Sequence, residues 1–553
     1  MNKEFPSHVS LTVFLFVIQL SLLIFASPSP IDGASGIGII SFGFTTLNSI
    51  VSDIQAIEIE LSQVQVPSSS MTLNICREVV GRSLKQFAYV QNAMDSITLT
   101  LNQASLAQMA LTAANTYVRT CQQALDEAGE DSHGPFGSVI LLLEAAGADQ
   151  CTTSQAISQA ITEIAKHTPK QDNTETEIPI TQATPGAIIE SVPASRRVRV
   201  AKDGSGNFTT INDAVKNVPL NQNAYFLIYV DEGKYEEYVL ITSDQPYLIL
   251  AGAGEGKTII TGNRSTGTGW GTFYSSTVAV EAENFIGFNM TIENTAGPVN
   301  SQAVALRTSA SFSAFHRCTI LGFQDTLFVH VGYQFFRQCT IAGTIDFIFG
   351  YSSVVFQNCI FILRQPLNGQ SNVITASGRN CSTDLTGISI HMSSIMSAPE
   401  LKNTTVSYLG RPWGNYARSA FLLSNFKASI DPSRWYPMNG SPADVEFGEF
   451  DNPGLGTRAS VLRNNGTLDH KLDRNSAYQF TVDRMLMGDV SDTLIQLNWR
   501  GAKTHFTSLH SRLYFASTLA SSPPLALDKP LPTSKFQLRR SSLPPDLPKM
   551  AIK

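Results

Sequence analysis

Residues 315–359 read FHRCTILGFQDTLFVHVGYQFFRQCTIAGTIDFIFGYSSVVFQNC, and this stretch repeats a cadence of aromatic residue, polar residue and cysteine. Cys318, Cys339 and Cys359 follow one another at intervals of 21 and 20 residues. The short β-branched and aromatic segments between them leave no room for crossover helices. A period of roughly 20–25 residues in β-rich sequence favours a solenoid, most simply a parallel β-helix in which one repeat forms one coil.

The same pattern of short apolar segments begins at residue 198 and predicts an all-β domain over residues 198–490. Segments such as AYFLIYV, YLILAGAG and SVVFQNCIFIL are short, apolar and broken by Gly, Asn and Asp. A β-sandwich would not need so regular a repeat, so the β-helix is the favoured architecture.

Residues 35–165 follow a different pattern. In SLKQFAYVQNAMDSITLTL and LAQMALTAANTYVRTCQQALDEA, apolar residues recur at three- and four-residue steps, which predicts an all-α helical bundle. Residues 166–197, rich in Thr, Pro and Glu, predict a linker. The basic cluster RRVR at 196–199 is either a processing site or a set of surface arginines that enter a strand.

The two ends of the chain carry other signals. Residues 1–27 contain an apolar run from Leu11 to Ala26, which predicts a cleaved signal peptide or a retained anchor. Seven N-x-S/T sequons are compatible with a secreted glycoprotein, and an oxidising compartment would let some of the seven cysteines pair. Residues 491–553 hold nine Lys or Arg against three Asp or Glu and many Pro and Ser, which predicts a disordered basic tail.

Two aspartates interrupt the apolar sequence of the repeat. Asp325 and Asp346 lie 21 residues apart, and residues one coil apart stack on parallel strands about 4.8 Å from each other. We therefore expect both carboxylates on adjacent coils of one face, with Gln302 one coil earlier and Gln324 beside Asp325. The alternative is that each aspartate only ends a strand and caps a turn.

Such a pair suits catalysis. Two neighbouring carboxyl groups do not ionise together readily, so one keeps its proton and their pKa values separate. The charged group can attack a carbonyl, and the protonated group can supply a proton to a leaving group. The glutamine amides can donate to a developing oxyanion. The set fits an acyl transfer or a glycosidic cleavage.

The segment LGRPW at 409–413 adds two candidates. Pro412 stiffens the local chain. Arg411 can form a two-pronged pair with a carboxylate and hold it ionised, and Trp413 offers a flat apolar face to a sugar ring. An Arg–Trp stack on the surface is the alternative.

Other function classes are disfavoured. AGAGEGKT at 251–258 matches a relaxed phosphate-loop pattern, but β-branched sequence follows it where a helix is needed. The sequence contains no G-x-S-x-G nucleophile motif and no histidine cluster suited to a metal. We expect no metal, no cofactor, no nucleotide and no nucleic acid as partner.

Taken together, the motifs resemble those of the plant pectinesterases (pectin methylesterases) with an N-terminal inhibitor-like region. The resemblance is specific over about 198–490 and weak over about 60–165. It implies a right-handed parallel β-helix enzyme, secreted to the cell wall, that acts on methyl-esterified pectin. In chain order the motifs are GKYEE at 233–237, ENTAGP at 293–298, QAVAL at 302–306, QDTL at 324–327, DFIFG at 346–350 and LGRPW at 409–413.

The resemblance also implies a role for each candidate residue. Asp346 would be the nucleophile that forms a covalent intermediate. Asp325 would protonate departing methanol and then activate water, and Gln302 and Gln324 would stabilise the oxyanion. Arg411 would orient the nucleophile.

Substrate binding would rest on four of the implied residues. These are Gln302, Arg411, Trp413 and Phe349, of which the aromatic pair would line the sugar subsites. Phe328 stands where the family usually has Tyr, and beyond residues 488–489 the chain no longer resembles the family.

The inhibitor-like region implies autoinhibition, or a folding aid, by the chain's own N-terminal domain. In that region the resemblance implies a Cys121–Cys151 disulfide. In the β-domain we expect a Cys318–Cys339 disulfide, because these residues lie one coil apart. Alternative functions are an inactive pectin-binding or inhibitor-like protein and a polysaccharide-cleaving β-helix enzyme. The pairing of Cys76, Cys121, Cys151, Cys359 and Cys381 stays open, with Cys121–Cys151 as the family-like pair and Cys359–Cys381 as one option.

Overall fold

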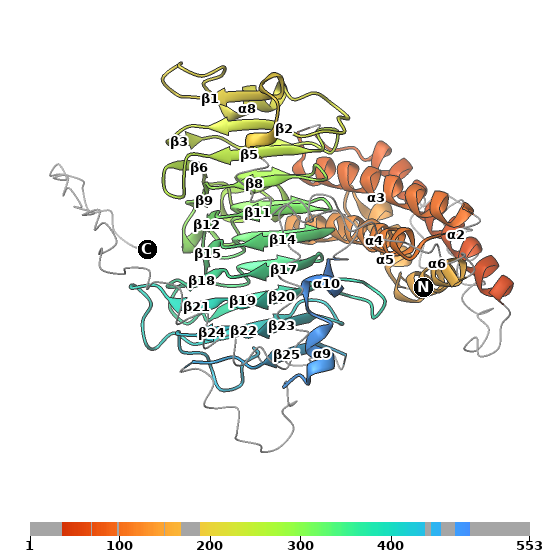
Figure 1. The fold of residues 1–553 in the computed structure, drawn as a ribbon. Helices are drawn as coiled ribbons and strands as arrows, with labels where there is room; N and C mark the ends of the chain where they lie inside the picture. Colours follow the sequence, from red (N-terminus) through yellow and green to blue (C-terminus); the bar gives the residue numbers. More distant parts are fainter. Residues whose placement is uncertain are drawn as a thin grey trace, which may run out of the picture. The chain divides into compact units, whose positions relative to one another are not determined.

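The computed structural model describes residues 36–67, 69–96, 99–148, 150–166, 189–436, 444–454 and 471–486 (Figure 1). The predicted signal or anchor segment, most of the predicted linker and the predicted basic tail lie outside the described residues. No described helix combines the length and the apolar character needed to cross a membrane.

The N-terminal region is helical, as its periodicity predicts. Thr100 begins one helix with a capping box that includes Gln103, and Gly129 ends it with a left-handed φ of 69°. Ser70 caps the preceding helix by accepting from the Leu73 N–H. The long helices are α2 (Gly36–Gln63), α3 (Met71–Asp95), α4 (Leu101–Ala128), α5 (Gly137–Ala148) and α6 (Gln150–Lys166).

From residue 197 the chain winds through three parallel sheets, and from β2 (Phe226–Val230) onward each successive strand passes to another sheet. The three sheets hold ten, seven and eight strands among the described residues, and every pairing within them is parallel. Leu306 pairs with Leu327, and Leu327 with Ile348, so one coil spans 21 residues in this region. The predicted parallel β-helix is confirmed.

The elements of this region have the following bounds. The ten-stranded sheet contains β1 (Arg197–Val200), β2 (Phe226–Val230), β5 (Leu248–Gly252), β8 (Ile286–Phe288), β11 (Ser313–His316), β14 (Tyr333–Arg337), β17 (Ser353–Gln357), β20 (Gly387–His391), β23 (Arg418–Leu422) and β25 (Glu446–Phe450). The seven-stranded sheet contains β4 (Val239–Ile241), β7 (Val278–Val280), β10 (Leu306–Ser309), β13 (Leu327–Val331), β16 (Ile348–Gly350), β19 (Asn372–Ser377) and β22 (Ser407–Pro412). The eight-stranded sheet contains β3 (Gly233–Glu236), β6 (Thr258–Gly262), β9 (Thr291–Asn294), β12 (Thr319–Leu321), β15 (Thr340–Gly343), β18 (Ile360–Leu363), β21 (Ser394–Ser397) and β24 (Asn425–Phe426). Short helices are η1 (Ala194–Arg196), α8 (Ile211–Lys216), η2 (Thr266–Thr268), η3 (Thr272–Tyr274), η4 (Pro298–Asn300), α9 (Arg474–Tyr478) and α10 (Val482–Met485).

The polar residue before each repeated cysteine turns a corner of the coil. Arg317, Gln338 and Asn358 lie between paired strands of two sheets and have left-handed φ values of 50°, 53° and 54°. One left-handed residue bends the chain sharply, and its polar side chain stays outside the core. The repeat of aromatic residue, polar residue and cysteine in the sequence therefore marks one corner in each coil.

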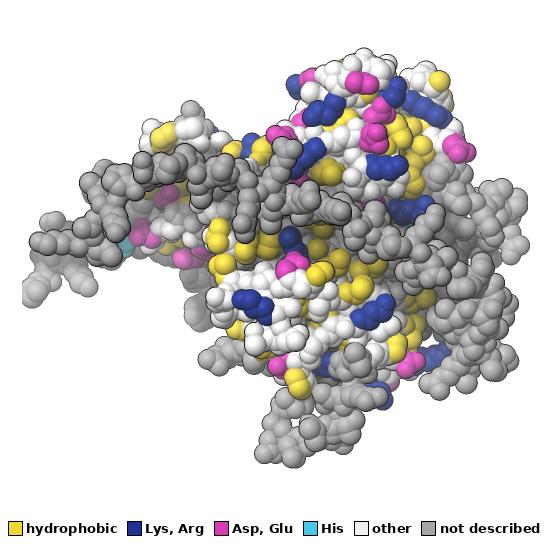
Figure 2. Space-filling view, turned by 90° about the vertical axis from the view of Figure 1, so that its left-hand side faces the viewer, with side chains coloured by type: hydrophobic (Ala, Val, Ile, Leu, Met, Phe, Trp, Pro, Cys, Tyr) yellow, Lys and Arg dark blue, Asp and Glu magenta, His cyan; other side chains and the backbone are white. Residues whose placement is uncertain are grey.

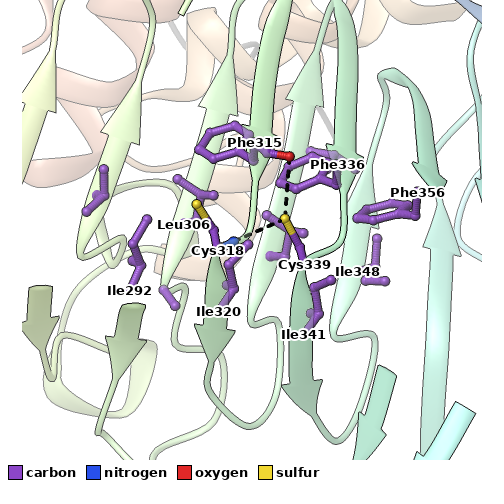
Figure 3. Close-up of a cluster of buried hydrophobic side chains, with 14 of the residues drawn as sticks. Ile292, Leu306, Phe315, Cys318, Ile320, Phe336, Cys339, Ile341, Ile348 and Phe356 are labelled. Atoms are coloured by element: carbon purple, nitrogen blue, oxygen red, sulfur yellow. Dashed lines mark hydrogen bonds between the residues drawn. The ribbon is translucent and has the colours of Figure 1, made fainter. Parts of the chain in front are cut away.

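The aromatic residues of the cadence stack in the core (Figure 3). Phe336 lies between Phe315 and Phe356, with ring centroids 4.7 and 4.8 Å away. All three rings are buried, and each stacks on the ring of the neighbouring coil. The in-register repeat builds this continuous apolar column.

The predicted Cys318–Cys339 disulfide is wrong. Both cysteines are buried free thiols, and so is Cys359. The Cys339 thiol donates to the Phe315 carbonyl at 3.4 Å (Figure 3), while Cys318 contacts the His316 carbonyl at 3.6 Å. Stacked side chains on parallel coils point the same way, and these two thiols make hydrogen bonds to neighbouring groups, including the Cys318 N–H to the Cys339 sulfur at 3.5 Å, without forming a covalent S–S bond.

The predicted Cys121–Cys151 disulfide is also wrong. Cys121 on α4 bonds to Cys76 on α3, where the two helices pack closely and the Cα atoms lie 4.5 Å apart. Cys151 lies in the first turn of α6 and bonds to Cys381, which belongs to the β-helix. Helix α6 turns this cysteine toward the β-helix and not toward α4.

The RRVR cluster enters a strand, as one of its two interpretations predicts. Arg197 begins β1 and pairs with Leu227, and Arg196 donates to the Tyr225 carbonyl at 2.9 Å. On the face of the eight-stranded sheet, Figure 2 shows Lys, Arg, Asp and Glu side chains mixed at the top, where Figure 1 places β1 and α8. The mixture of signs gives this end no single-sign field.

Candidate active site

Asp325 and Asp346 occupy equivalent positions on successive coils. Each lies two residues before a strand of the seven-stranded sheet, at the paired positions Leu327 and Ile348. The Asp325 N–H donates to the Ile345 carbonyl at 3.0 Å. Both aspartates adopt left-handed backbone conformations, with φ values of 59° and 47°. Equal register and equal backbone conformation place the two carboxyl groups on one face.

Arg411 binds Asp346 in the two-pronged manner expected for an arginine and a carboxylate. The Arg411 Nε lies 2.8 Å from Oδ1 and 2.9 Å from Oδ2, and a terminal guanidinium nitrogen also donates to Oδ2. The arginine comes from β22, which pairs with β19, which in turn pairs with β16 beside Asp346. Two coils of winding thus bring together residues 65 positions apart.

The surroundings treat the two carboxyl groups differently. Burial raises the pKa of Asp325 well above its ordinary value, and the neighbouring charges of Asp346 and Glu127 raise it further against the opposing effect of Arg411. Burial also raises the pKa of Asp346, but its hydrogen bonds and charge pairing with Arg411 lower it. Of the two carboxyl groups, Asp325 is thus the one favoured to keep a proton and Asp346 the one favoured to carry the charge.

The two glutamines lie next to this pair. The Ala303 N–H donates to the Gln324 carbonyl at 3.2 Å, which puts Gln302 and Gln324 on adjacent coils. The Thr266 hydroxyl donates to Gln302 Oε1 at 2.8 Å and thereby fixes the side-chain amide. With its oxygen engaged, the amide has its NH₂ group available to donate.

The aromatic candidates differ in exposure. Trp413 is 37% exposed and packs on Tyr351 and Phe349, with ring centroids 4.7 and 5.8 Å away. Phe349 is buried and stacks on Phe328 at 4.4 Å. Phe328, which stands where the resembled family usually has tyrosine, thus takes part in an aromatic stack beneath the site. Of Trp413 and Phe349, only Trp413 is exposed to solvent.

Helices cover this part of the β-helix. Phe328, Phe349 and Tyr351 share one hydrophobic core with residues of the helical region. Glu127 of α4 accepts from the Thr272 N–H at 2.9 Å, and its charge acts on Asp325. The helical region therefore lies over the candidate site.

A buried ion network links the helical region to the β-helix. Glu281 is almost fully buried and binds Arg82 of α3 and Arg307 of β10. Tyr274 donates to Glu78 at 2.6 Å, and the Tyr117 hydroxyl donates to the Ser309 carbonyl at 3.3 Å. These polar contacts join helices α3 and α4 to the β-helix.

The sequence did not point to Thr266, Glu127 or Tyr351. None belongs to a motif. Thr266 and Glu127 meet the site through the packing of segments far away in the chain, whereas Tyr351 directly follows the motif at 346–350. Thr266 precedes a glycine-rich stretch, and Glu127 belongs to a helix whose docking face carries no distinctive signature.

The comparisons with known proteins agree with this geometry. The family model described as Pectinesterase matches residues 197–489. The chain is 42% identical over 309 residues to the Arabidopsis thaliana "Probable pectinesterase/pectinesterase inhibitor 41", covering 54% of each protein. It is 40% identical over 358 residues to "Putative pectinesterase/pectinesterase inhibitor 38" of the same plant, covering 64% of this chain and 71% of the relative.

The solved structure of "Pectin methylesterase from Carrot" is also similar. It matches with a TM-score of 0.53 and 36% identity, covering 55% of this chain and 97% of the carrot chain. With the first curated relatives, the alignments span about half of the relative's length.

Proposed function

The chain belongs to the pectinesterase family, and from that premise we propose that it hydrolyses the methyl esters of cell-wall pectin to methanol and pectate. The observation that carries the proposal is the buried pair Asp325 and Asp346, with Arg411 bound to the second carboxylate. The pair supplies a charged nucleophile and a protonated acid at one ester-sized site.

The reaction proceeds in two halves. The Asp346 carboxylate attacks the ester carbonyl, and the amides of Gln302 and Gln324 stabilise the negative charge that forms on its oxygen. The intermediate collapses to an acyl-enzyme anhydride as Asp325 gives its proton to the leaving methoxide. Asp325, now charged, takes a proton from water, and the resulting hydroxide releases galacturonate and regenerates Asp346.

Each supporting residue has a separate task. Arg411 keeps Asp346 ionised and aimed, although burial opposes its charge. The exposed ring of Trp413 packs on a sugar ring of the polymer. Phe349 supports this ring from below.

The helical region acts as an inhibitor of its own chain in this proposal. Its contacts with Thr272 and its shared core with Phe328 and Phe349 would block a polymer from the site. The chain would divide into a signal segment at 1–27, a helical region at 35–165, a linker at 166–197, a β-helix at 198–490 and a tail at 491–553. The protein would be secreted to the cell wall.

Polysaccharide cleavage is the second enzyme candidate. Retaining glycosidases also use two carboxyl groups about 5 Å apart, so proximity alone does not separate the two reactions. Ester hydrolysis releases methanol without new reducing ends, whereas chain cleavage creates reducing ends.

Asp346→Asn tests the proposal in protein freed of its helical region. We expect methanol release to fall by at least 10³-fold, because the neutral amide cannot attack the ester, while binding to pectin stays unchanged. Methanol assay, reducing-end assay and pectin co-sedimentation are measured on the same preparations. Asp231→Asn serves as the control, because it alters an exposed ion pair with Arg199 of β1, at the first strand of the β-helix and outside the candidate site. Parallel loss of binding and activity would support a binding module, and new reducing ends would support a glycosidase.

A further inference from the structure

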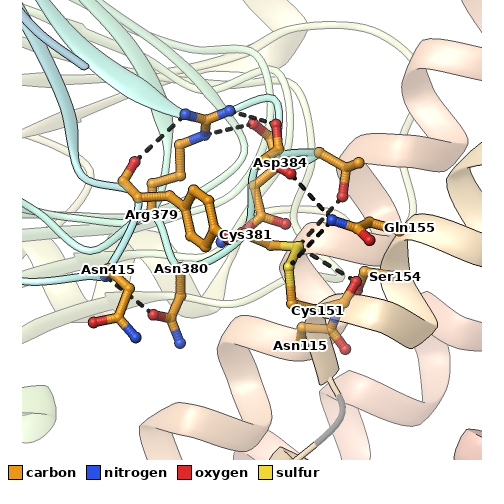
Figure 4. The surroundings of a disulfide bond; sticks show 12 residues. Asn115, Cys151, Ser154, Gln155, Arg379, Asn380, Cys381, Asp384 and Asn415 are labelled. Atoms are coloured by element: carbon orange, nitrogen blue, oxygen red, sulfur yellow. Dashed lines mark hydrogen bonds between the residues drawn. A yellow bond between two sulfur atoms is a disulfide. The ribbon is translucent and has the colours of Figure 1, made fainter. Parts of the chain in front are cut away.

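One disulfide joins the helical region to the β-helix. Cys151, in the first turn of α6, bonds to Cys381 across a sequence separation of 230 residues (Figure 4). The other disulfide in the described part of the chain stays within the helical region. The Cys151–Cys381 bond is therefore a second covalent path between the two regions, besides the connecting segment at 167–196.

The β-helix end of this bond is rigidly held (Figure 4). Cys381 is buried in the loop between β19 and β20, and its N–H donates to Asp384 Oδ2 at 3.1 Å. Arg379 spans the same loop, donating to the Asp384 carbonyl at 3.0 Å and to Glu446 at 2.9 Å. The loop thus presents its sulfur in one place.

The helical end is also positioned. Gln155, one turn after Cys151, donates to the Ser382 hydroxyl at 3.2 Å. Thr112 of α4 donates to Asp384 in the same loop at 3.4 Å. Two hydrogen bonds therefore accompany the disulfide and dock α4 and α6 on this loop.

The loop borders the candidate active site. The Trp413 N–H donates to the Ser377 carbonyl at 3.2 Å, immediately before the loop begins. The ion network of Arg82 and Glu281 fastens the helical region elsewhere, through α3. The helical region is thus held at separate points, and the covalent one lies on the loop that follows Ser377, the partner of the Trp413 backbone.

We propose that the Cys151–Cys381 disulfide keeps the helical region on the β-helix after the connecting segment has been cut, so that release of the enzyme requires both proteolysis and reduction. The part concerning activity rests on the proposed function; the covalent retention does not. A tether of this kind keeps the effective concentration of the cover near the millimolar range, whatever the dilution of the protein. The polar contacts at the interface then re-form after each opening.

Release proceeds by thiol–disulfide exchange with an external dithiol. A thiolate of the dithiol attacks one sulfur of the half-buried bond and forms a mixed disulfide, which closes to the dithiol's own disulfide. Cys151 and Cys381 leave as two thiols, having gained two electrons and two protons. The buried free thiols of the β-helix core take no part.

The test uses the full-length secreted protein with a recognition sequence for a site-specific protease inserted between residues 171 and 185. After cutting, wild type should remain one species on a denaturing gel without reductant and separate into two with dithiothreitol. Cys151→Ser and Cys381→Ser should each separate without reductant. Ser382→Ala, which loses the Gln155 hydrogen bond but keeps both cysteines, should behave as wild type. Two species from cut wild type without reductant would overturn the proposal.

The same samples give the activity arm after dilution to nanomolar concentration. Cut wild type should stay at the methanol release of uncut protein and rise at least 10-fold with dithiothreitol, whereas cut Cys151→Ser should rise without it. Equal rises in cut wild type and cut Cys151→Ser without reductant would overturn the tether. If the separated β-helix of Cys151→Ser released no methanol, the proposed function would fail while the gel result stood on its own.

Discussion

The charge on Asp346 depends on a single arginine. Burial raises the pKa of this carboxyl, and the bonds from Arg411 are what lower it. Arg411 donates to both carboxylate oxygens of Asp346, which also fixes the orientation of this carboxylate. The same contact therefore sets both the ionisation and the orientation of Asp346. A lysine at this position would keep a positive charge but lose the fork.

We therefore predict that Arg411→Lys lowers kcat by about 10²- to 10³-fold, comparable to the loss of a preorganised polar contact. Weaker pairing also raises the pKa of Asp346, so activity, which needs the ionised form, is lost at a higher pH as the solution is acidified. The pH profile of kcat/KM measures this shift of the acidic limb. Arg418→Lys, which alters a pair with Glu446 outside the site, is the control. An unshifted limb would mean that Arg411 does not set the charge.

The coils owe their regularity to side-chain columns in the core. Phe336 is fully buried between two rings at 4.7 and 4.8 Å. Because each ring packs on the next coil, a gap in the column weakens the contacts of two coils at once.

Phe336→Ala should lower the free energy of unfolding by about 3–5 kcal/mol, the usual cost of removing a buried aromatic ring. Urea denaturation monitored by circular dichroism measures the change. Phe288→Ala is the matched control, since that ring is half-buried and stacks on His316 at 5.6 Å. Equal losses for the two variants would show that the column adds nothing beyond ordinary burial.

The repeat made the coils predictable and the cysteine pairing unpredictable. The cadence contains the corner residue, the core aromatic and the period, which together imply parallel strands and adjacent Asp325 and Asp346. The same cadence suggested a bond between Cys318 and Cys339, but stacking in register also keeps both thiols aligned toward carbonyls. Proximity alone did not decide between a column of thiols and a disulfide.

The docking of helices on coils could not be predicted from the sequence. Helical periodicity shows that α3 and α4 have an apolar face, but not which surface that face meets. The bond from Cys151 to Cys381 and the contact from Glu127 to Thr272 join segments far apart in the chain. Such pairings depend on shape complementarity, which leaves no periodic trace in either segment.

His330 lies at the centre of this interface. It is fully buried on β13, where its ring nitrogens contact the Thr120 hydroxyl at 2.8 Å and the Ser309 hydroxyl at 2.9 Å. Burial lowers its pKa well below 6.5, and the charges of Arg307 and Arg82 lower it further. The imidazole is therefore neutral in the folded protein.

The sign of the pH effect follows from this depression. The unfolded chain binds a proton at His330 near pH 6.5, whereas the folded chain does not, so the stabilising contribution is complete above pH 6.5 and declines as the pH falls below it. Each pH unit below that value removes at most about 1.4 kcal/mol. Acidification from about pH 7 to pH 5 should thus cost at most about 2 kcal/mol through this one residue.

His330→Asn should remove that part of the pH dependence, because the amide can bond to both hydroxyls and does not titrate. The measurement is the free energy of unfolding in urea at pH 7 and at pH 5, for wild type and variant.

His316 provides the control, since burial lowers its pKa to about 4 at a corner strand away from the helices. His316→Asn should flatten the pH dependence of global unfolding without changing the acid-induced opening of the helical cover, followed by hydrogen exchange in α4. His330→Asn should flatten both, and an unchanged opening in that variant would remove His330 from the control of this interface.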